Sequence, residues 1–371
     1  MEDKLVTLAI HTFEKAQILK TILESEDIEV FIHNVNQIQP VISAGVRVRI
    51  KESDLTKALQ IIEAIQFFKE EDDSQEDEGV KQVFIPVDFS DYSMRACEIG
   101  FEYASELGAD VMLFHAYYEA FTPSSLFYHE TGQERHDNES AIKAYDRVQK
   151  DIKEMTSVID KKISDGEMPE VKYDYIISEG LPEDEIIAYA KTYRPTLIVM
   201  GTRGKNRKKL DLIGSVTSEI IETTNVPLLA IPEDITFGNL KEAGTVAFAT
   251  SFNRQDIVAF DHFIKLMGSY KLSIHLFNMS ISKDESNEIR LTGMCEYLKK
   301  QYTDIDIDFT VLNDGDLLDA IDNLVREKQI DIITLTTHKR SMITRIFNPS
   351  IASRMLFHAN TALFVIPKYN K

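Results

Sequence analysis

The stretch from Thr196 to Pro232 contains the residues best suited to bind an anion. A continuous apolar run, Leu197 to Met200, predicts a buried parallel strand. Glycines and a serine then follow in the order Gly201-x2-Gly204-x9-Gly214-Ser215. Glycine lets backbone amides approach an anion closely, because it has no Cβ and tolerates positive φ. The spacing therefore indicates two short-range contacts with phosphate groups, which would suit a polyphosphate better than a single phosphate.

A helix is predicted over residues 215–224, directly after the last of these glycines. The start of a helix presents unpaired N–H groups and the positive end of the helix dipole. Ser215 and Thr217 add hydroxyl donors. The loop before the helix is basic, with Arg203, Lys205, Arg207, Lys208 and Lys209. An alternative stays open, in which the glycines only turn the chain and the basic side chains are solvated.

Two familiar phosphate-binding motifs do not fit this loop. A Walker P-loop needs Ser or Thr after its lysine, but Lys205 is followed by Asn206. The glycine spacing also differs from the dinucleotide motif G-x-G-x-x-G. The loop must therefore be interpreted through the elements that surround it.

Residues 82–235 alternate between predicted strands and helices. The strands are 83–88, 111–116, 172–178, 196–200 and 226–231, and the helices lie near 91–107, 139–163, 183–192 and 215–224. This alternation is typical of a parallel sheet with helices on both faces. Ligands of such sheets bind at the carboxyl ends of the strands. Asp88, Ala116 and Gly201 all lie at such ends, so they are expected to share one site.

The glycine signature, placed after a Val-Met-Gly strand end, resembles the nucleotide-binding signature of the universal stress protein family. The segment Val83–Ser90 is similar to the first strand and turn of that family. The run Glu179-Gly180-Leu181-Pro182 resembles the loop and helix start before its fourth strand. The resemblance covers residues 82–232. It implies a Rossmann-like fold of the adenine-nucleotide alpha-hydrolase type.

The resemblance also implies a ligand, ATP (or AMP or ADP), accompanied by Mg²⁺ when a triphosphate is bound. Pro86, Val87 and Asp88 would line the adenine and ribose, and Ala116 and Met200 would lie near the adenosine. The residues expected to meet ribose or phosphates are Gly201, Arg203, Gly204, Gly214, Ser215, Val216 and Thr217. The loop shows no obvious general base, since Asp211 and Glu179 are more simply solvated carboxylates. We therefore expect binding with slow hydrolysis at most, and no catalytic residue is assigned.

Residues 243–371 repeat the pattern of the preceding segment, which predicts a tandem duplication. Val246–Asn253 aligns with Val83–Ser90, and Phe364–Pro367 aligns with Leu229–Pro232. The signature itself is lost, because Ser251, Thr336, Lys339 and Pro349 replace Asp88, Gly201, Gly204 and Gly214, and only Ser350 still matches Ser215. Side chains at glycine positions would occupy the phosphate space. The second copy is therefore not expected to bind nucleotide in the same way. Its basic loop leaves open the binding of a smaller anion.

The N-terminal residues 1–68 predict a small α+β domain in the order β-α-β-β-α. Its strands are expected at 5–9, 28–32 and 46–50, and its helices at 13–24 and 55–68. The pattern resembles a family of small prokaryotic signal-transducing domains. Residues 69–81 are strongly acidic and predict an extended linker. The fold class expected is thus α/β, with two tandem five-stranded parallel-sheet domains, at 82–235 and 243–371, after a small α+β domain.

Composition limits the partners of this 371-residue chain. The formal net charge of −20 opposes binding to nucleic acid or to anionic membrane surfaces. No apolar run is long enough for a membrane span, and the N-terminus lacks a signal-peptide pattern. The two cysteines, Cys97 and Cys295, fit buried thiols in a reducing compartment, so a cytoplasmic location is expected.

Three functions remain open on the sequence alone. The first is an ATP-binding stress-response or signalling protein that contacts a protein partner not identified by the sequence. The second is a nucleotide-independent scaffold or adaptor, in which strands 226–231 and 363–366 pair to form an internal pseudo-dimer, with or without further homo-oligomerisation. The third is an ATPase or phosphotransferase. The intact glycine signature of the first copy favours the first function, because a scaffold does not need it. The loop 118–138, which has no counterpart in the second copy, is either a lid or partner contact or a surface insertion.

Overall fold

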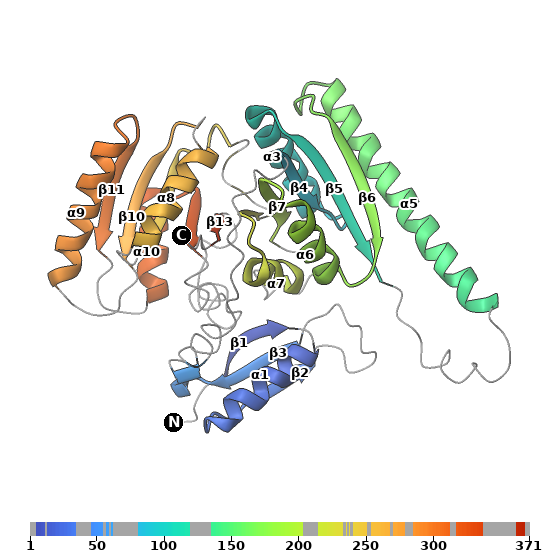
Figure 1. Cartoon of the computed structure of the whole chain (residues 1–371), viewed down its shortest axis with the longest axis horizontal. Coiled ribbons are helices and arrows are strands. Elements are labelled where there is room, and N and C mark those ends of the chain that lie inside the picture. The colour runs from blue at the N-terminus through green and yellow to red at the C-terminus, as the bar shows by residue number, and fades with distance from the viewer. Residues whose placement is uncertain are drawn as a thin grey trace.

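The computed structural model shows an α/β protein with one large sheet and one small sheet (Figure 1). The structure describes residues 5–11, 13–34, 46–54, 57–58, 61, 81–118, 135–202, 214–232, 235, 237, 240–250, 254–267, 270–278, 285–311, 317–336 and 361–367. Within these ranges no helix is both long and apolar enough to cross a membrane. The loop 118–138 and the acidic linker lie mostly or wholly outside the described residues.

The first half of the large sheet contains five parallel strands. In chain order its elements are β4 (Gln82–Pro86), α3 (Asp91–Leu107), β5 (Asp110–Tyr117), α5 (Arg135–Ser164), β6 (Tyr173–Glu179), α6 (Pro182–Tyr193), β7 (Leu197–Gly201), α7 (Ser215–Thr223) and β8 (Leu228–Ile231). The strands lie in the order β6-β5-β4-β7-β8. The chain order reverses beside β4, so the carboxyl ends of β4 and β7 flank a topological switch point, where ligands of such sheets bind.

The second half has the same strand order. Its elements are β9 (Thr245–Thr250), α8 (Arg254–Met267), β10 (Ser273–Asn278), α9 (Glu285–Gln301), β11 (Asp306–Val311), α10 (Leu317–Lys328), β12 (Ile332–Thr336) and β13 (Ala362–Ile366). The strands lie in the order β11-β10-β9-β12-β13. The last strands of the two halves, β8 and β13, pair antiparallel with Phe364 opposite Leu229. This pairing makes one continuous ten-stranded sheet.

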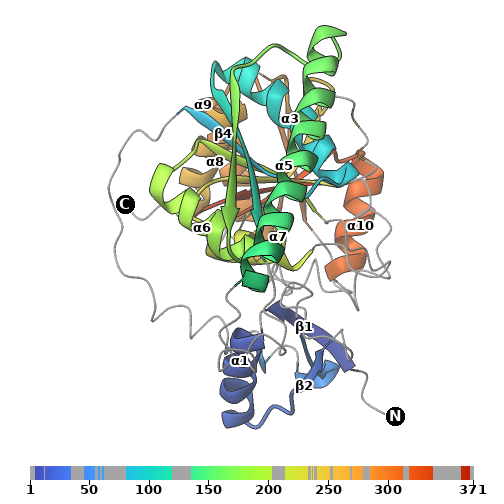
Figure 2. The same ribbon diagram turned by 90° about the vertical axis from the view of Figure 1, so that its right-hand side faces the viewer.

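Helices cover both faces of the large sheet, and Figure 2 shows them on either side of its strands. One core lies on the face covered by α3, α5, α8 and α9, and contains side chains such as Phe101, Ile152, Phe260 and Leu298. The other core lies under α6, α7 and α10, with Ile186, Ile220 and Leu324. Every residue of the central strands β7, β8, β12 and β13 is buried, as expected for strands between two helical layers.

The two halves also contact one another away from the paired strands. The Tyr103 hydroxyl of α3 donates to the Leu266 carbonyl of α8 at 3.0 Å. The connecting segment is held against α3, since the Leu240 amide donates to Glu102 Oε2 at 3.0 Å. Burial raises the pKa of Glu102 above its usual value, against the lowering effect of that hydrogen bond. The connection therefore packs as part of the core, because Phe237 and Leu240 are both buried.

The N-terminal domain is a three-stranded antiparallel sheet with one described helix. Its elements are β1 (Leu5–His11), α1 (Phe13–Ser25), β2 (Phe31–Asn34) and β3 (Val46–Lys51), and its strand order is β1-β3-β2. Leu8, Leu23, Val48 and Ile50 form its core. Of the predicted second helix, residues 57, 58 and 61 are helical and the others lie outside the described residues. Strand β1 contacts α7 of the large sheet's first half, and Figures 1 and 2 both show them as neighbours.

Most strand boundaries differ from the sequence-based expectation by one to three residues, and three of the differences have a local cause. The second strand starts at Phe31 rather than at residue 28, because the Ile28 amide still closes α1 by donating to the Leu23 carbonyl. Strand β4 ends at Pro86 rather than at Asp88, where the chain turns. Strand β8 starts at Leu228, because the Val226 amide donates to the Thr224 hydroxyl instead of to a strand.

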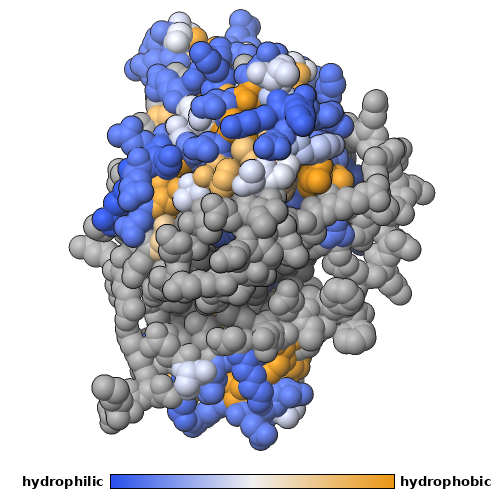
Figure 3. Space-filling view, turned by 90° about the vertical axis from the view of Figure 1, so that its left-hand side faces the viewer, coloured by the Kyte–Doolittle hydropathy of each residue, from blue (hydrophilic) through white to orange (hydrophobic). Residues whose placement is uncertain are grey.

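The surface agrees with the acidic, polar composition. Figure 3 views the side formed by the second half and the N-terminal domain, and the coloured surface there is mainly hydrophilic with separate small hydrophobic patches. Cys97 and Cys295 are both free and buried. Burial raises the pKa of both thiols, so neither is a reactive thiolate.

Candidate functional site

The candidate site is built first from the turn after β4. The Val87 amide donates to the Phe114 carbonyl of β5 at 2.8 Å, so the chain follows β5 for one residue beyond the strand. Phe89 then adopts a positive φ of 60°, a conformation that a bulky residue rarely takes. The turn ends at Ser90, the N-cap of α3. This sharp reversal places Asp88 at the carboxyl edge of the sheet.

Asp88 is held by several hydrogen bonds. Its Oδ1 accepts from the Ser90 amide at 3.1 Å, from the Ser90 hydroxyl at 2.5 Å and from the Ser93 hydroxyl at 2.7 Å. Ser90 and Ser93 also form a capping box that starts α3. The sequence indicated Asp88 as a ligand residue, but not this structural role. The network fixes the carboxylate relative to the sheet, as a binding group requires.

The second part of the site surrounds the glycines after β7. The Thr202 amide donates to the Ile231 carbonyl at 2.8 Å, and the Gly214 amide donates to the Thr202 carbonyl at 2.7 Å. These bonds bring Gly214 back to the end of β7, although it lies far from Gly201 in the sequence. Gly201 and Gly214 therefore lie close together. Arg203 and Gly204, also predicted to meet the ligand, lie outside the described residues.

Thr217 has a different role from the one expected. Its hydroxyl donates to the Gly201 carbonyl at 2.9 Å, and the side chain is only 3% exposed. The hydroxyl therefore ties α7 to the end of β7 and is not directed at a ligand. The expected hydroxyl contact of Thr217 with phosphate does not fit this geometry, because its proton is already used.

The start of α7 has the electrostatics of an anion site. Gly214 is the N-cap in an extended conformation and brings no side chain to pair with the first-turn amides. The first turn of α7 contains no acidic residue, whereas that of α6 contains Glu183, Asp184 and Glu185. Carboxylates in the first turn would offset the positive end of the helix dipole. The amides of Ser215 and Val216 thus begin a helix whose positive end is not offset by its own side chains.

The other predicted residues lie in the same region. Ala116, the last residue but one of β5, is half-buried, Met200 is buried next to Gly201, and Val216 is half-buried. All three pack with the core under α6 and α7. Pro86 is the last residue of β4. The carboxyl ends of β4, β5 and β7 thus bring together an acidic side chain, an apolar floor and a helix start. Such a combination can hold a sugar, a flat ring and phosphates.

The second half is different at the equivalent positions. Thr336, which aligns with Gly201, is 1% exposed, and its hydroxyl has no hydrogen-bond partner among the described residues. Asp256, which aligns with Ser93, is fully buried and accepts from the Thr250 hydroxyl at 3.0 Å. The carboxylate has thus moved from the loop to the helix. Ser251, Lys339 and Pro349, which replace three further signature residues, lie outside the described residues.

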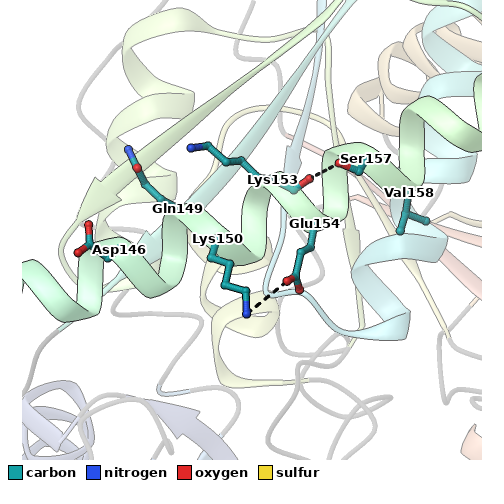
Figure 4. Close-up of a pocket in the computed structure, with 7 residues that line it drawn as sticks. All are labelled: Asp146, Gln149, Lys150, Lys153, Glu154, Ser157 and Val158. Carbon is teal, nitrogen blue, oxygen red and sulfur yellow. Dashed lines mark hydrogen bonds and ion pairs between the residues drawn. The ribbon is translucent and has the colours of Figure 1, made fainter.

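Other features offer less chemistry. Among the described residues no cluster of three or more His, Cys, Asp or Glu side chains could hold a metal ion. A depression of about 590 Å³ lies on α5 and is lined by Asp146, Gln149, Lys150, Lys153, Glu154, Ser157 and Val158. Figure 4 shows that all seven side chains come from this single helix, with Lys150 paired to Glu154. We therefore treat the depression as an open helix surface. Glu179 is exposed, and Asp211 lies outside the described residues.

Comparisons with known proteins identify the families that two segments of the chain match. The profile of the universal stress protein family matches residues 79–232, and a family described as "Putative prokaryotic signal transducing protein" matches residues 14–66. Universal stress protein MJ0531 of Methanocaldococcus jannaschii is 29% identical over 154 residues, 41% of this chain and 81% of that protein. Universal stress protein MJ0577 of the same organism is 26% identical over 155 residues, 41% of this chain and 94% of that protein.

One solved structure extends the similarity of fold beyond this segment. It is a universal stress protein from Archaeoglobus fulgidus, 18% identical, with a TM-score of 0.50. The match covers 78% of this chain and 97% of that chain. A match of this extent is longer than the segment 79–232, so it includes parts of the chain beyond the profile match.

Proposed function

Because residues 79–232 form a universal stress protein domain, we propose that this segment binds an adenine nucleotide, ATP or its products AMP or ADP. The phosphates would meet the amides of Ser215 and Val216 at the start of α7, with Gly214, whose own amide donates to the Thr202 carbonyl, letting them approach because it has no Cβ. Asp88 would accept hydrogen bonds from the ribose hydroxyls, and Ala116 and Met200 would contact the adenosine. A Mg²⁺ ion would be held mainly by the triphosphate and water.

One observation carries this proposal above the others. The Gly214–Thr202 hydrogen bond places the start of α7 beside the end of β7, and the first turn of α7 has no acidic side chain. The site therefore combines the first backbone amides of a helix with a dipole that favours negative charge. A scaffold would gain nothing from leaving a helix start in this state.

We further propose that the second half is a duplicated copy with an altered site. The shared strand order and the paired last strands support an internal pseudo-dimer. The domain boundaries proposed are 1–68, 82–235 and 243–371. Because Thr336 places a side chain at the position of Gly201, one nucleotide should bind per chain.

The contact between the N-terminal domain and α7 would connect nucleotide binding to a signalling function. Its edge strand β1 contacts α7, the helix whose first turn would hold the phosphates. In Figure 1 the arrowheads of β5 and β6 point to the side of the molecule where this domain lies. A ligand that orders α7 would thus also act on β1. A change in the bound nucleotide would then alter the N-terminal domain through this direct contact.

Hydrogen–deuterium exchange of the full chain, with and without ATP and Mg²⁺, tests both parts of the proposal. Nucleotide is expected to slow exchange in peptides covering residues 87–93 and 214–218, and more weakly in β1. Protection in the first half without any change in β1 would leave nucleotide binding intact but contradict the signalling route. Unchanged exchange throughout at millimolar ATP would contradict nucleotide binding and favour the scaffold.

A further inference from the structure

The turn over residues 87–90 must be fixed if Asp88 is to bind a ligand. The turn contains one costly feature, the positive φ of Phe89, which a glycine would adopt more easily. The Asp88 network with Ser90 and Ser93 holds the end of the turn that leads into α3. At the end that leaves β4, the Val87 amide is held by the Phe114 carbonyl, so the Val87 carbonyl and the Phe89 side chain are the groups that a further contact must position.

His115 of β5 makes two contacts with that end of the turn. Its Nδ1 lies 2.7 Å from the Val87 carbonyl oxygen, and its ring lies against the Phe89 ring with centroids 4.3 Å apart. One side chain thus contacts the residues on both sides of Asp88. Because a carbonyl oxygen can only accept, Nδ1 must carry a proton and donate it.

These two contacts restrict the backbone conformation of the turn. The hydrogen bond fixes the direction of the Val87 carbonyl. The ring contact fixes the position of the Phe89 side chain, which depends on the positive φ of that residue. The peptide groups before and after Asp88 are thereby set. Neither contact uses the Asp88 carboxylate itself, which stays available to the network with α3.

We propose that His115 is a positioning residue of the nucleotide site, holding the 87–90 turn so that Asp88 meets the ribose. This rests on the proposed function of the first half. The sequence of the second half offers a natural comparison, since Asn278 aligns with His115. Asparagine also carries a donor two bonds beyond Cβ, so it can replace the hydrogen bond while losing the ring.

Two variants separate the contributions of the bond and the ring. His115→Phe keeps an aromatic ring beside Phe89 but loses the donor to Val87. His115→Asn keeps a donor but loses the ring. Losing one net hydrogen bond in the bound state corresponds to about a tenfold rise in Kd. We expect about that rise for His115→Phe and a clearly smaller rise for His115→Asn, measured by calorimetric titration of the full chain with ATP and Mg²⁺.

Tyr189→Phe is the matched control. It removes a hydroxyl that donates to Gln82 Oε1 at 2.8 Å, at the start of β4 and so at the opposite edge of the sheet. Its Kd should equal that of the wild type. Hydrogen–deuterium exchange of residues 87–93, measured without nucleotide, should be faster in His115→Phe than in either other variant.

The outcomes separate this proposal from the proposed function. If the wild type binds nucleotide and His115→Phe binds equally well, His115 has no positioning role while the nucleotide site stands. If both His115 variants lose binding together with their thermal stability, while exchange in the 87–93 turn is unchanged relative to the rest of the first half, the residue acts only in the core. If the wild type itself fails to bind, the proposed function fails and this proposal with it.

Discussion

A Ser215→Pro variant should keep its fold and lose most of its affinity for nucleotide. Ser215 is the first residue of α7, a position where proline is favoured because the missing amide has no helical partner. Gly214, with ψ of 158°, already has the extended conformation required before proline. The substitution therefore removes one amide and one hydroxyl from the phosphate site without breaking the helix.

The expected loss follows from the charge of the ligand. Hydrogen bonds to charged groups contribute about 1.5–3 kcal/mol each, which corresponds to roughly a 10- to 100-fold rise in Kd. Calorimetric titration with ATP and Mg²⁺ measures this rise. Ser215→Ala is the control, because it removes the hydroxyl and keeps the amide, and its loss should be smaller. If the Ser215→Pro variant is folded and binds nucleotide as tightly as the wild type, the start of α7 is not part of the binding site.

A Phe364→Ala variant should destabilise both halves of the large sheet. Phe364 is completely buried in β13, opposite Leu229 of β8, and its ring packs edge-on against Phe263 with centroids 5.3 Å apart. Truncating a buried phenylalanine typically costs about 3–5 kcal/mol. Since the cavity would open at the junction of β8 and β13, the loss should not be confined to the second half.

Urea unfolding followed by hydrogen–deuterium exchange measures the loss in each half separately. Peptides from β7 and from β10 should lose protection at the same reduced urea concentration. Val158→Ala on the exposed face of α5 is the control, because its side chain is 45% exposed and its truncation should change the free energy of unfolding little. If β10 loses protection while β7 keeps the wild-type midpoint, the halves fold independently and the continuous sheet is not a cooperative unit.

Much of the fold can be predicted from local patterns in the sequence. The expected helix 91–107 has the same bounds as α3, because its start is marked by Ser90 and its end by Gly108, which adopts a left-handed conformation. The glycine signature also leads correctly to the end of β7 and the start of α7. These features depend on neighbouring residues and on hydrophobic periodicity, which a sequence displays directly.

The details of the site depend on contacts between distant residues, and they were missed for that reason. Val87 lies in the turn after β4 and His115 lies on β5, 28 residues away, so nothing local connects them. The hydroxyl of Thr217 was expected to face phosphate, but it donates to Gly201, 16 residues away. The sequence also gave no signal that the Tyr103 hydroxyl would bind the Leu266 carbonyl in the other half.

The central claim is that the chain binds one adenine nucleotide, in its first half. Calorimetric titration of the nucleotide-free full chain with ATP and Mg²⁺ tests it most directly, after denaturing a sample to confirm that no bound nucleotide was carried through purification. We predict a single class of site with one nucleotide per chain, weakened in Ser215→Pro. Two equivalent sites per chain, or no heat and no thermal stabilisation at millimolar ATP, would contradict the claim.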